Sequence, residues 1–300
     1  MATGQGLKSE PLRAALRNAL AGQPETPEQL FVRYGGGPDP RPNLKLAAAF
    51  GDEMEAHEDV RRGAAARLLA RLAAEDAAPD MPPVFLPMAA AFGWVGRVRG
   101  HHDEALAWDA LRELAGDERV PVRVATHAAL RAYAHVGNQA GELVARAGDW
   151  FEAEDREVRF GAAAVVVEVL GERQALACVP EIAEVLDYLS RAIADAADAP
   201  RSAERSDGRR RLLAALPRAI AAVVAAGGEE GLTWLERECG YAQQPGVRAM
   251  LSDAVVRVLE LGALVGQRAR AALEASAKPL RDPSRVRPGA GRGKATRRMR

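Results

Sequence analysis

The sequence predicts an all-α fold in which helical pairs stack into a right-handed α-α superhelix, followed by a disordered basic C-terminal tail. Three observations favour this class. Apolar residues make up 48% of the chain and aromatic residues only 5%, while alanine, the strongest helix former, is abundant. Amphipathic segments of helical period follow one another, and the alternation typical of strands is nearly absent. One helical pattern also recurs four times.

Residues 1–42 are expected to form two short helices and a linker that pack on the rest of the chain. The first helix is predicted over residues 10–21, where Ser9 can cap its N-terminus. The second begins at the capping-box sequence Thr26-Pro27-Glu28-Gln29 and ends at the glycine run that starts at Gly35. The Pro and Gly residues that follow predict the linker.

Residues 43–277 are expected to form the superhelix. Most breaks between its helical segments contain Pro, Gly or Asp, such as Gly227-Gly228. Pro217 lies inside a helical pattern and predicts a kink. The polar stretch 198–208 predicts an exposed loop. The predicted helices cover residues 43–56, 58–76, 82–99, 103–115, 120–136, 139–151, 156–171, 178–197, 207–226, 229–240, 245–262 and 264–276.

Residues 278–300 lose the apolar period and are rich in Arg, Pro and Gly, which predicts a disordered tail. The tail carries nine basic residues and one acid. The first 277 residues carry the other 32 basic and 40 acidic residues, which leaves them with a net charge of −8. Such a split indicates an interaction tail. Its candidate contact residues are Arg292, Lys294, Arg297, Arg298 and Arg300.

The recurring pattern begins with Val-Arg and places apolar residues eight and twelve positions after the valine, on one helical face. The fourth position is small in three copies, which lets a neighbouring helix pack closely. The starts are 62, 36 and 89 residues apart. The longest gap fits two helical pairs with a degenerate copy at 209–222, and the first gap needs the extra helix at 82–99. The copies start at Val60, Val122, Val158 and Val247.

Acidic residues precede three of the four Val-Arg starts, and this combination resembles the second helix of HEAT repeats. The acids are Asp59, then Asp117 with Glu118, then Asp155 with Glu157, whereas the fourth copy has Gln243-Gln244. The resemblance covers residues 44–276. It implies a HEAT-like solenoid in which Asp and Arg side chains form a ladder between adjacent repeats. Independently of the resemblance, no helical pair buries its apolar stripe alone, so stacked neighbours complete the core.

The arginines of the four Val-Arg starts are candidate binding-surface residues, and two interpretations stand side by side. They line a concave face and contact phosphates, or they pair with the preceding acids between repeats. The second interpretation is favoured because acids are present at three of the four starts. The four residues are Arg61, Arg123, Arg159 and Arg248.

The segment from Trp150 to Arg159 is similar to part of the HEAT-like alkylpurine DNA glycosylases, in which a tryptophan precedes an arginine-bearing helix in the groove. The resemblance implies that Trp150 and Arg159 face a groove, with Arg156 as a further candidate. Trp108-Asp109 would supply a second aromatic group and an acid, but its spacing does not match. The net acidic body disfavours duplex binding.

No local motif predicts catalysis, a metal site or a cofactor. The sequence His101-His102 is followed by acids but is interpreted as a helix start, because neither HExxH nor a Cys–His cluster accompanies it. Cys178 and Cys239 fit no metal or redox spacing and are expected to be reduced, which suits the cytoplasm. No signal-peptide core opens the sequence, and no apolar run reaches the roughly 18 residues of a membrane span.

The sequence therefore supports two candidate functions. The first is a non-enzymatic scaffold that binds a protein partner on its curved surface, without cofactor or membrane. The second is a nucleic-acid-binding protein, including a DNA alkylpurine glycosylase. The basic tail has three open interpretations: it contacts nucleic acid or another acidic partner, it lies on its own acidic body, or it has no role.

Overall fold

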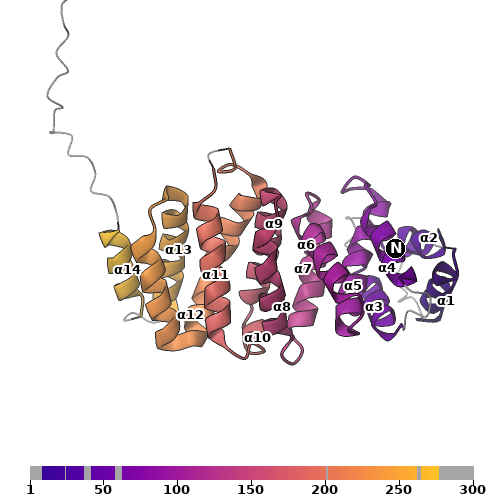
Figure 1. The fold of residues 1–300 in the computed structure, drawn as a ribbon, viewed down its shortest axis with the longest axis horizontal. Helices are drawn as coiled ribbons and strands as arrows, with labels where there is room; N and C mark the ends of the chain where they lie inside the picture. Colours follow the sequence, from indigo (N-terminus) through magenta and orange to yellow (C-terminus); the bar gives the residue numbers. More distant parts are fainter. Residues whose placement is uncertain are drawn as a thin grey trace, which may run out of the picture.

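The computed structural model describes residues 9–23, 25–36, 42–57, 63–200, 202–261 and 265–276. Every regular element in these ranges is a helix, so the predicted all-α class is confirmed. The helices follow one another in sequence order along the long axis, from α1 (Ser9–Leu20) to α14 (Val265–Ala275), as Figure 1 shows. The predicted tail lies outside the described residues.

The N-terminal half contains seven further elements. They are α2 (Glu25–Tyr34), α3 (Leu44–Ala56), α4 (Ala64–Ala73), the 3-10 turn η1 (Pro82–Val84), α5 (Phe85–Arg99), α6 (Glu104–Gly116) and α7 (Val120–Ala134).

The C-terminal half continues in the same manner up to α14. Its elements are α8 (Gln139–Gly148), the 3-10 turn η2 (Asp149–Glu152), α9 (Arg156–Leu170), α10 (Arg173–Leu176), α11 (Ile182–Ala197), α12 (Asp207–Tyr241) and α13 (Pro245–Leu261).

One layer of helices runs the length of the molecule. In it α3 packs on α5, α5 on α7, α7 on α9, α9 on α12 and α12 on α13. The helices α6, α8 and α11 lie against this layer and connect its members, and α14 packs on α12 and α13 at the C-terminal end (Figure 1). The helices α1 and α2 close the N-terminal end, where Phe31 of α2 packs against Phe50 and Phe85 with ring centroids 5.0 and 5.9 Å away.

The apolar face of the Val-Arg repeat forms the core, as predicted. The residue eight positions after the valine is buried in every copy, at Leu68, Leu130, Val166 and Val255. Four positions further on, Leu72, Ala134 and Leu170 are buried and Leu259 is half-buried. The helices that carry the four copies, α4, α7, α9 and α13, appear in this order along the axis (Figure 1). The start of α12 supplies the degenerate copy, and α5 is the extra helix before α7.

Glycines allow the closest helix crossings. A Cβ atom added to Gly96 in α5 would overlap the carbonyl oxygen of Gly51 in α3. Where α6 crosses α9, a Cβ atom on Gly161 would lie 3.0 Å from the Cα of Gly116. Gly161 is the fourth residue of the Val158 repeat, so the small residue at this position does admit a neighbouring helix.

Four local features differ from the sequence prediction. α4 begins only after Gly63, whose φ of +81° is left-handed, and α11 begins at Ile182 because Pro180 interrupts the predicted helix. The short α10 was not predicted. The backbone is helical at Pro217, where the sequence predicts a kink, whereas the predicted break at Gly227-Gly228 is confirmed by the φ of 55° at Gly228. Glycine takes this conformation without steric cost.

α12 is long and apolar enough to match a membrane span by length and composition, in contrast to the sequence prediction. Gly228 interrupts it, and α9, α11, α13 and α14 pack against it. In the structure, 44% of its apolar 18-residue window is buried.

The crossing of α3 and α5 gives the first test. We expect Gly96→Ala to lower the free energy of unfolding by about 1–3 kcal/mol, because the new methyl group has no space beside Gly51. Gly240→Ala is the matched control: this glycine is also helical, and an added Cβ would contact nothing within 4 Å. It should be neutral or stabilising by up to about 1 kcal/mol. Urea unfolding measures both, and equal effects would contradict the close crossing.

Candidate binding surface

The Val-Arg arginines point back to the turn that precedes their helix. In each described copy, Nη1 donates to the carbonyl oxygen six residues earlier: Arg123 to Asp117 at 2.7 Å, Arg159 to Ala153 at 2.9 Å and Arg248 to Ala242 at 3.1 Å. These carbonyl groups follow the C-terminus of a helix and have no partner within it. The repeated arginine therefore closes the turn between two helices. Arg61 lies outside the described residues.

Two of these arginines also reach the next helix along the array. Arg159 forms a bidentate ion pair with Asp195 of α11, with Nη2–Oδ1 and Nε–Oδ2 distances of 2.6 and 2.8 Å. Arg248 donates to the carbonyl oxygen of Leu273 at 2.7 Å and to the hydroxyl of Ser276. Since these contacts engage the guanidinium groups inside the structure, they are poorly placed to meet an external phosphate.

The acids that precede the repeats have other partners than the predicted ladder. The Asp117 carboxylate pairs with Arg119, Asp155 accepts from the amides of Glu157 and Val158 as the N-cap of α9, and Glu157 accepts from the amide of Gly208. In the copies that the structure describes, these preceding acids therefore do not pair with the Val-Arg arginines, and the acid that Arg159 does bind is Asp195 of α11.

The tryptophan of the glycosylase resemblance lies in the core. Trp150 is only 3% exposed, and its ring centroid lies 6.4 Å from that of the equally buried Trp108. Arg156 is exposed on the first turn of α9, and its one hydrogen bond, to the carbonyl oxygen of Asp198, is long at 3.4 Å. The structure therefore does not bring Trp150, Arg156 and Arg159 together on one groove.

The remaining sequence candidates add no reaction centre. His101 contacts the Glu104 carboxylate at 2.9 Å, and the described residues contain no group of three potential metal ligands. Burial raises the pKa of the Cys239 thiol to about 12, which keeps it protonated and unreactive. The five tail candidates lie outside the described residues.

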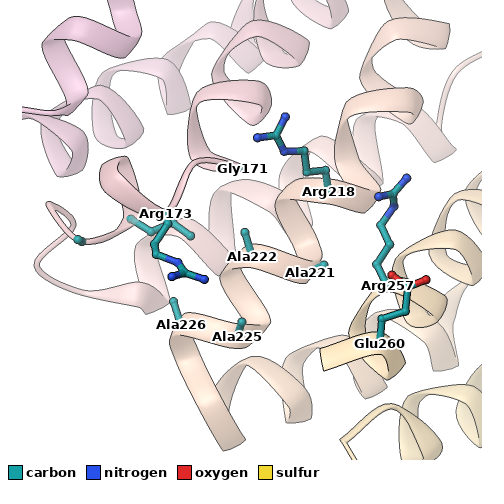
Figure 2. A pocket seen from close by; sticks show the side chains of 11 residues that line it. Gly171, Arg173, Arg218, Ala221, Ala222, Ala225, Ala226, Arg257 and Glu260 are labelled. Atoms are coloured by element: carbon teal, nitrogen blue, oxygen red, sulfur yellow. The ribbon is translucent and has the colours of Figure 1, made fainter. Parts of the chain in front are cut away.

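A pocket of about 700 Å³ opens beside α12, and Figure 2 shows it from close by. We call it the arginine-rimmed pocket. Its floor consists of alanines on one face of α12, and Arg218 projects from the same face. Arg173 comes from α10, while Arg257 and Glu260 come from α13. The floor alanines are Ala221, Ala222, Ala225 and Ala226.

The pocket follows from the spacing of these residues. The alanines lie three, four, seven and eight positions after Arg218, so they share its helical face. Their small side chains leave a hollow between α12 and its neighbours that larger residues would fill. In the view of Figure 2, Arg218 and Arg257 lie beside each other and Arg173 lies across the alanine floor.

The rim is cationic. Within the described part of the chain, Arg173, Arg218 and Arg257 form no hydrogen bond or ion pair with another residue. Glu260 is the one carboxylate among the described residues that line the pocket. This arrangement provides three guanidinium groups with free donors above an apolar floor, and it suits a ligand that is both anionic and apolar.

A smaller cavity of about 240 Å³ continues from this pocket and shares Gly171 and Arg218 with it. Its lining includes His127, Glu168 and Glu172. Burial lowers the pKa of His127, so the imidazole is neutral at physiological pH. The surface along α9 and α12 therefore carries both signs of charge and is not a continuous positive stripe.

Compared with known proteins, the chain matches no family model and no curated protein.

The sequence does not single out the three rim arginines, because they lie up to 84 positions apart. Each also has the sequence surroundings of an ordinary solvated surface arginine. One signal was present. Alanines occupy an exposed as well as a buried face of the segment after Arg218, where polar residues are expected on an ordinary surface helix.

The structural role assigned to Arg159 can be tested against a neighbour. Arg159→Ala should lower the free energy of unfolding by about 2–4 kcal/mol, because it leaves Asp195 and a carbonyl group without their partner. Arg156→Ala, on the same helical turn but exposed, should change it by less than about 0.5 kcal/mol. Chemical denaturation measures the free energy of unfolding of both variants. Similar losses in the two variants would show that the repeated arginine is dispensable.

Proposed function

We propose that this chain is a HEAT-like solenoid, a right-handed superhelix of helical pairs, that acts as a non-enzymatic scaffold and binds an acidic segment of a protein partner. The arginine-rimmed pocket is the observation that carries the proposal. Its volume of about 700 Å³ falls within the range of ligand pockets.

The chemistry of the pocket favours carboxylates flanked by apolar side chains. A guanidinium group binds a carboxylate through two parallel hydrogen bonds. Arg218 and Arg257 offer such donors above alanines that can cover the methyl and methylene groups of a partner. The segment that fits this description alternates or clusters Asp or Glu with small or aliphatic residues.

Nucleic acid is the second candidate, because three free arginines also suit phosphates. Three features favour the protein partner instead. The described residues that line the pocket include no aromatic ring on which a base would stack. Glu168, Glu172 and Glu260 lie along the same surface and repel phosphates. The first 277 residues also have a net charge of −8, which opposes a polyanion.

Binding of a labelled peptide in which Glu alternates with Leu tests the proposal. The full chain should bind it, and the double variant Arg218→Gln, Arg257→Gln should bind it at least about tenfold more weakly, since each charged hydrogen bond contributes roughly 1.5–3 kcal/mol. Arg205→Gln, at an exposed arginine outside the pocket, should bind as the parent does. The control also excludes binding by the basic tail, which all three proteins retain.

Single-stranded and duplex oligonucleotides serve as the competing probes in the same titration. Retention of an oligonucleotide that the double variant loses, with no binding of the peptide, would favour the nucleic-acid function. Equal peptide binding by the parent and the double variant would remove the pocket from the proposal.

A further inference from the structure

A second pocket, of about 630 Å³, lies where the C-terminus of α4, α6 and the starts of α7 and α9 meet. We call it the acid-rimmed pocket. Among the described residues that line it, Arg119 is the one basic residue. Its guanidinium group forms a bidentate ion pair with the Asp117 carboxylate, with Nη2–Oδ2 and Nε–Oδ1 distances of 2.7 and 2.9 Å. The acidic residues around it are Asp76, Glu113, Asp117, Glu118, Asp155 and Glu157.

Some of these acids serve the fold and others are free. Asp155 caps α9, and Glu157 binds the start of α12. Glu113 contacts Arg112 at 3.0 Å on the surface. The carboxylates of Asp76 and Glu118 have no hydrogen bond or ion pair to any residue that the structure describes. Arg119 attracts both carboxylates but forms its ion pair with Asp117, so the rim keeps a net negative charge.

The floor of the pocket is apolar and partly open to solvent. Leu106 is 51% exposed there, an unusual position for a large aliphatic side chain, and Ala110 and Leu114 lie beside it on α6. Trp94 closes the base with 1% of its surface exposed, and its indole Nε1 finds no acceptor among the described residues. An apolar floor under an acidic rim fits a cationic segment with some apolar side chains.

The C-terminal tail has this composition. Residues 278–300 contain nine basic residues and one acid. The apolar residues Leu280, Val286 and Met299 lie between the basic residues. The tail is thus the complement of the acid-rimmed pocket in charge and in apolar content.

Ser276, the last described residue before the tail, lies on the edge of the array where the pocket lies. Ser276, at the end of α14, contacts Arg248 at the start of α13. The guanidinium of Arg209, at the start of α12, lies against Gly246 of α13. Gly208 in turn donates to Glu157, which lines the pocket. One edge of the molecule therefore leads from Ser276 past the starts of α13, α12 and α9 to the acid-rimmed pocket (Figure 1).

The tail is long enough to follow this edge. Four steps between neighbouring helices, from α14 through α13, α12 and α9 to α7, amount to roughly 30–40 Å at 8–10 Å each. The 18 residues from Ser276 to Lys294 span up to about 60 Å when extended.

We propose that the acid-rimmed pocket binds the basic C-terminal segment, residues 278–300, of the same chain. Arg and Lys side chains of the segment meet Asp76, Glu118 and Glu113, and an apolar residue covers Leu106. The contact makes the tail an internal ligand that any other basic segment has to displace. It does not depend on the arginine-rimmed pocket, with which it shares no lining residue.

Zero-length cross-linking of the full chain tests this contact, because the sequence has only four lysines: Lys8, Lys45, Lys278 and Lys294. A water-soluble carbodiimide joins a lysine amine to a carboxylate in direct contact, and mass spectrometry identifies the joined peptides. We expect Lys294 or Lys278 to be joined to Asp76, Glu113 or Glu118 within the monomer. The products should decline at about 1 M salt, where the Debye length is about 3 Å.

A pair of matched variants separates the pocket from general attraction. In Asp76→Asn, Glu118→Gln, the yield of the product between Lys294 and Glu113 should fall about fivefold, as expected for the loss of two partly exposed charge pairs. Asp253→Asn, Glu230→Gln removes two exposed acids elsewhere and should leave the yield unchanged. Cross-links scattered over all exposed acids, equal yields in both double variants, or products found only in dimers would overturn the proposal.

Discussion

The carbonyl groups at the C-termini of the helices are the constraint on which this array depends. The last turn of every helix leaves carbonyl oxygens without an intrahelical donor, and stacking another helix over that end removes water as a partner. The chain meets this need with guanidinium groups from a following helix. The arginines that donate to such carbonyl groups are Arg97, Arg119, Arg123, Arg159, Arg209 and Arg248. Each also adds positive charge where the helix dipole is negative.

Close packing of small residues is the second requirement. Gly51 against Gly96 and Gly116 against Gly161 bring backbones so near that a methyl group has no space. The central helix α5 is buried on every side from Phe85 to Val98, so it joins the N-terminal helices to the repeats. Alanine is too large for these crossings, but its small side chain leaves hollows on the surface where it lies on a face that no neighbour covers, as along α12 after Arg218.

The two pockets lie at opposite ends of α9. α9 contributes Glu157 at its start to the acid-rimmed pocket, and Gly171 just after its end lines the arginine-rimmed pocket. Acids from the starts of α7 and α9 and from the ends of α4 and α6 gather at the first pocket, and arginines from α10, α12 and α13 gather at the second. The side chains that the fold does not pair, such as Asp76 and Arg218, are the ones free for a ligand.

The sequence by itself determined the helices, their order and their buried face, because helical period and capping are local properties of neighbouring residues. It also singled out the Val-Arg starts, but not their partners: whether Arg159 meets a phosphate, Asp155 or the carbonyl group of Ala153 depends on how the turn folds back. Only the tertiary structure brought Arg173, Arg218 and Arg257 to one pocket and took Trp150 into the core. These juxtapositions depend on which faces of distant helices meet, and that is decided by the packing of the whole array.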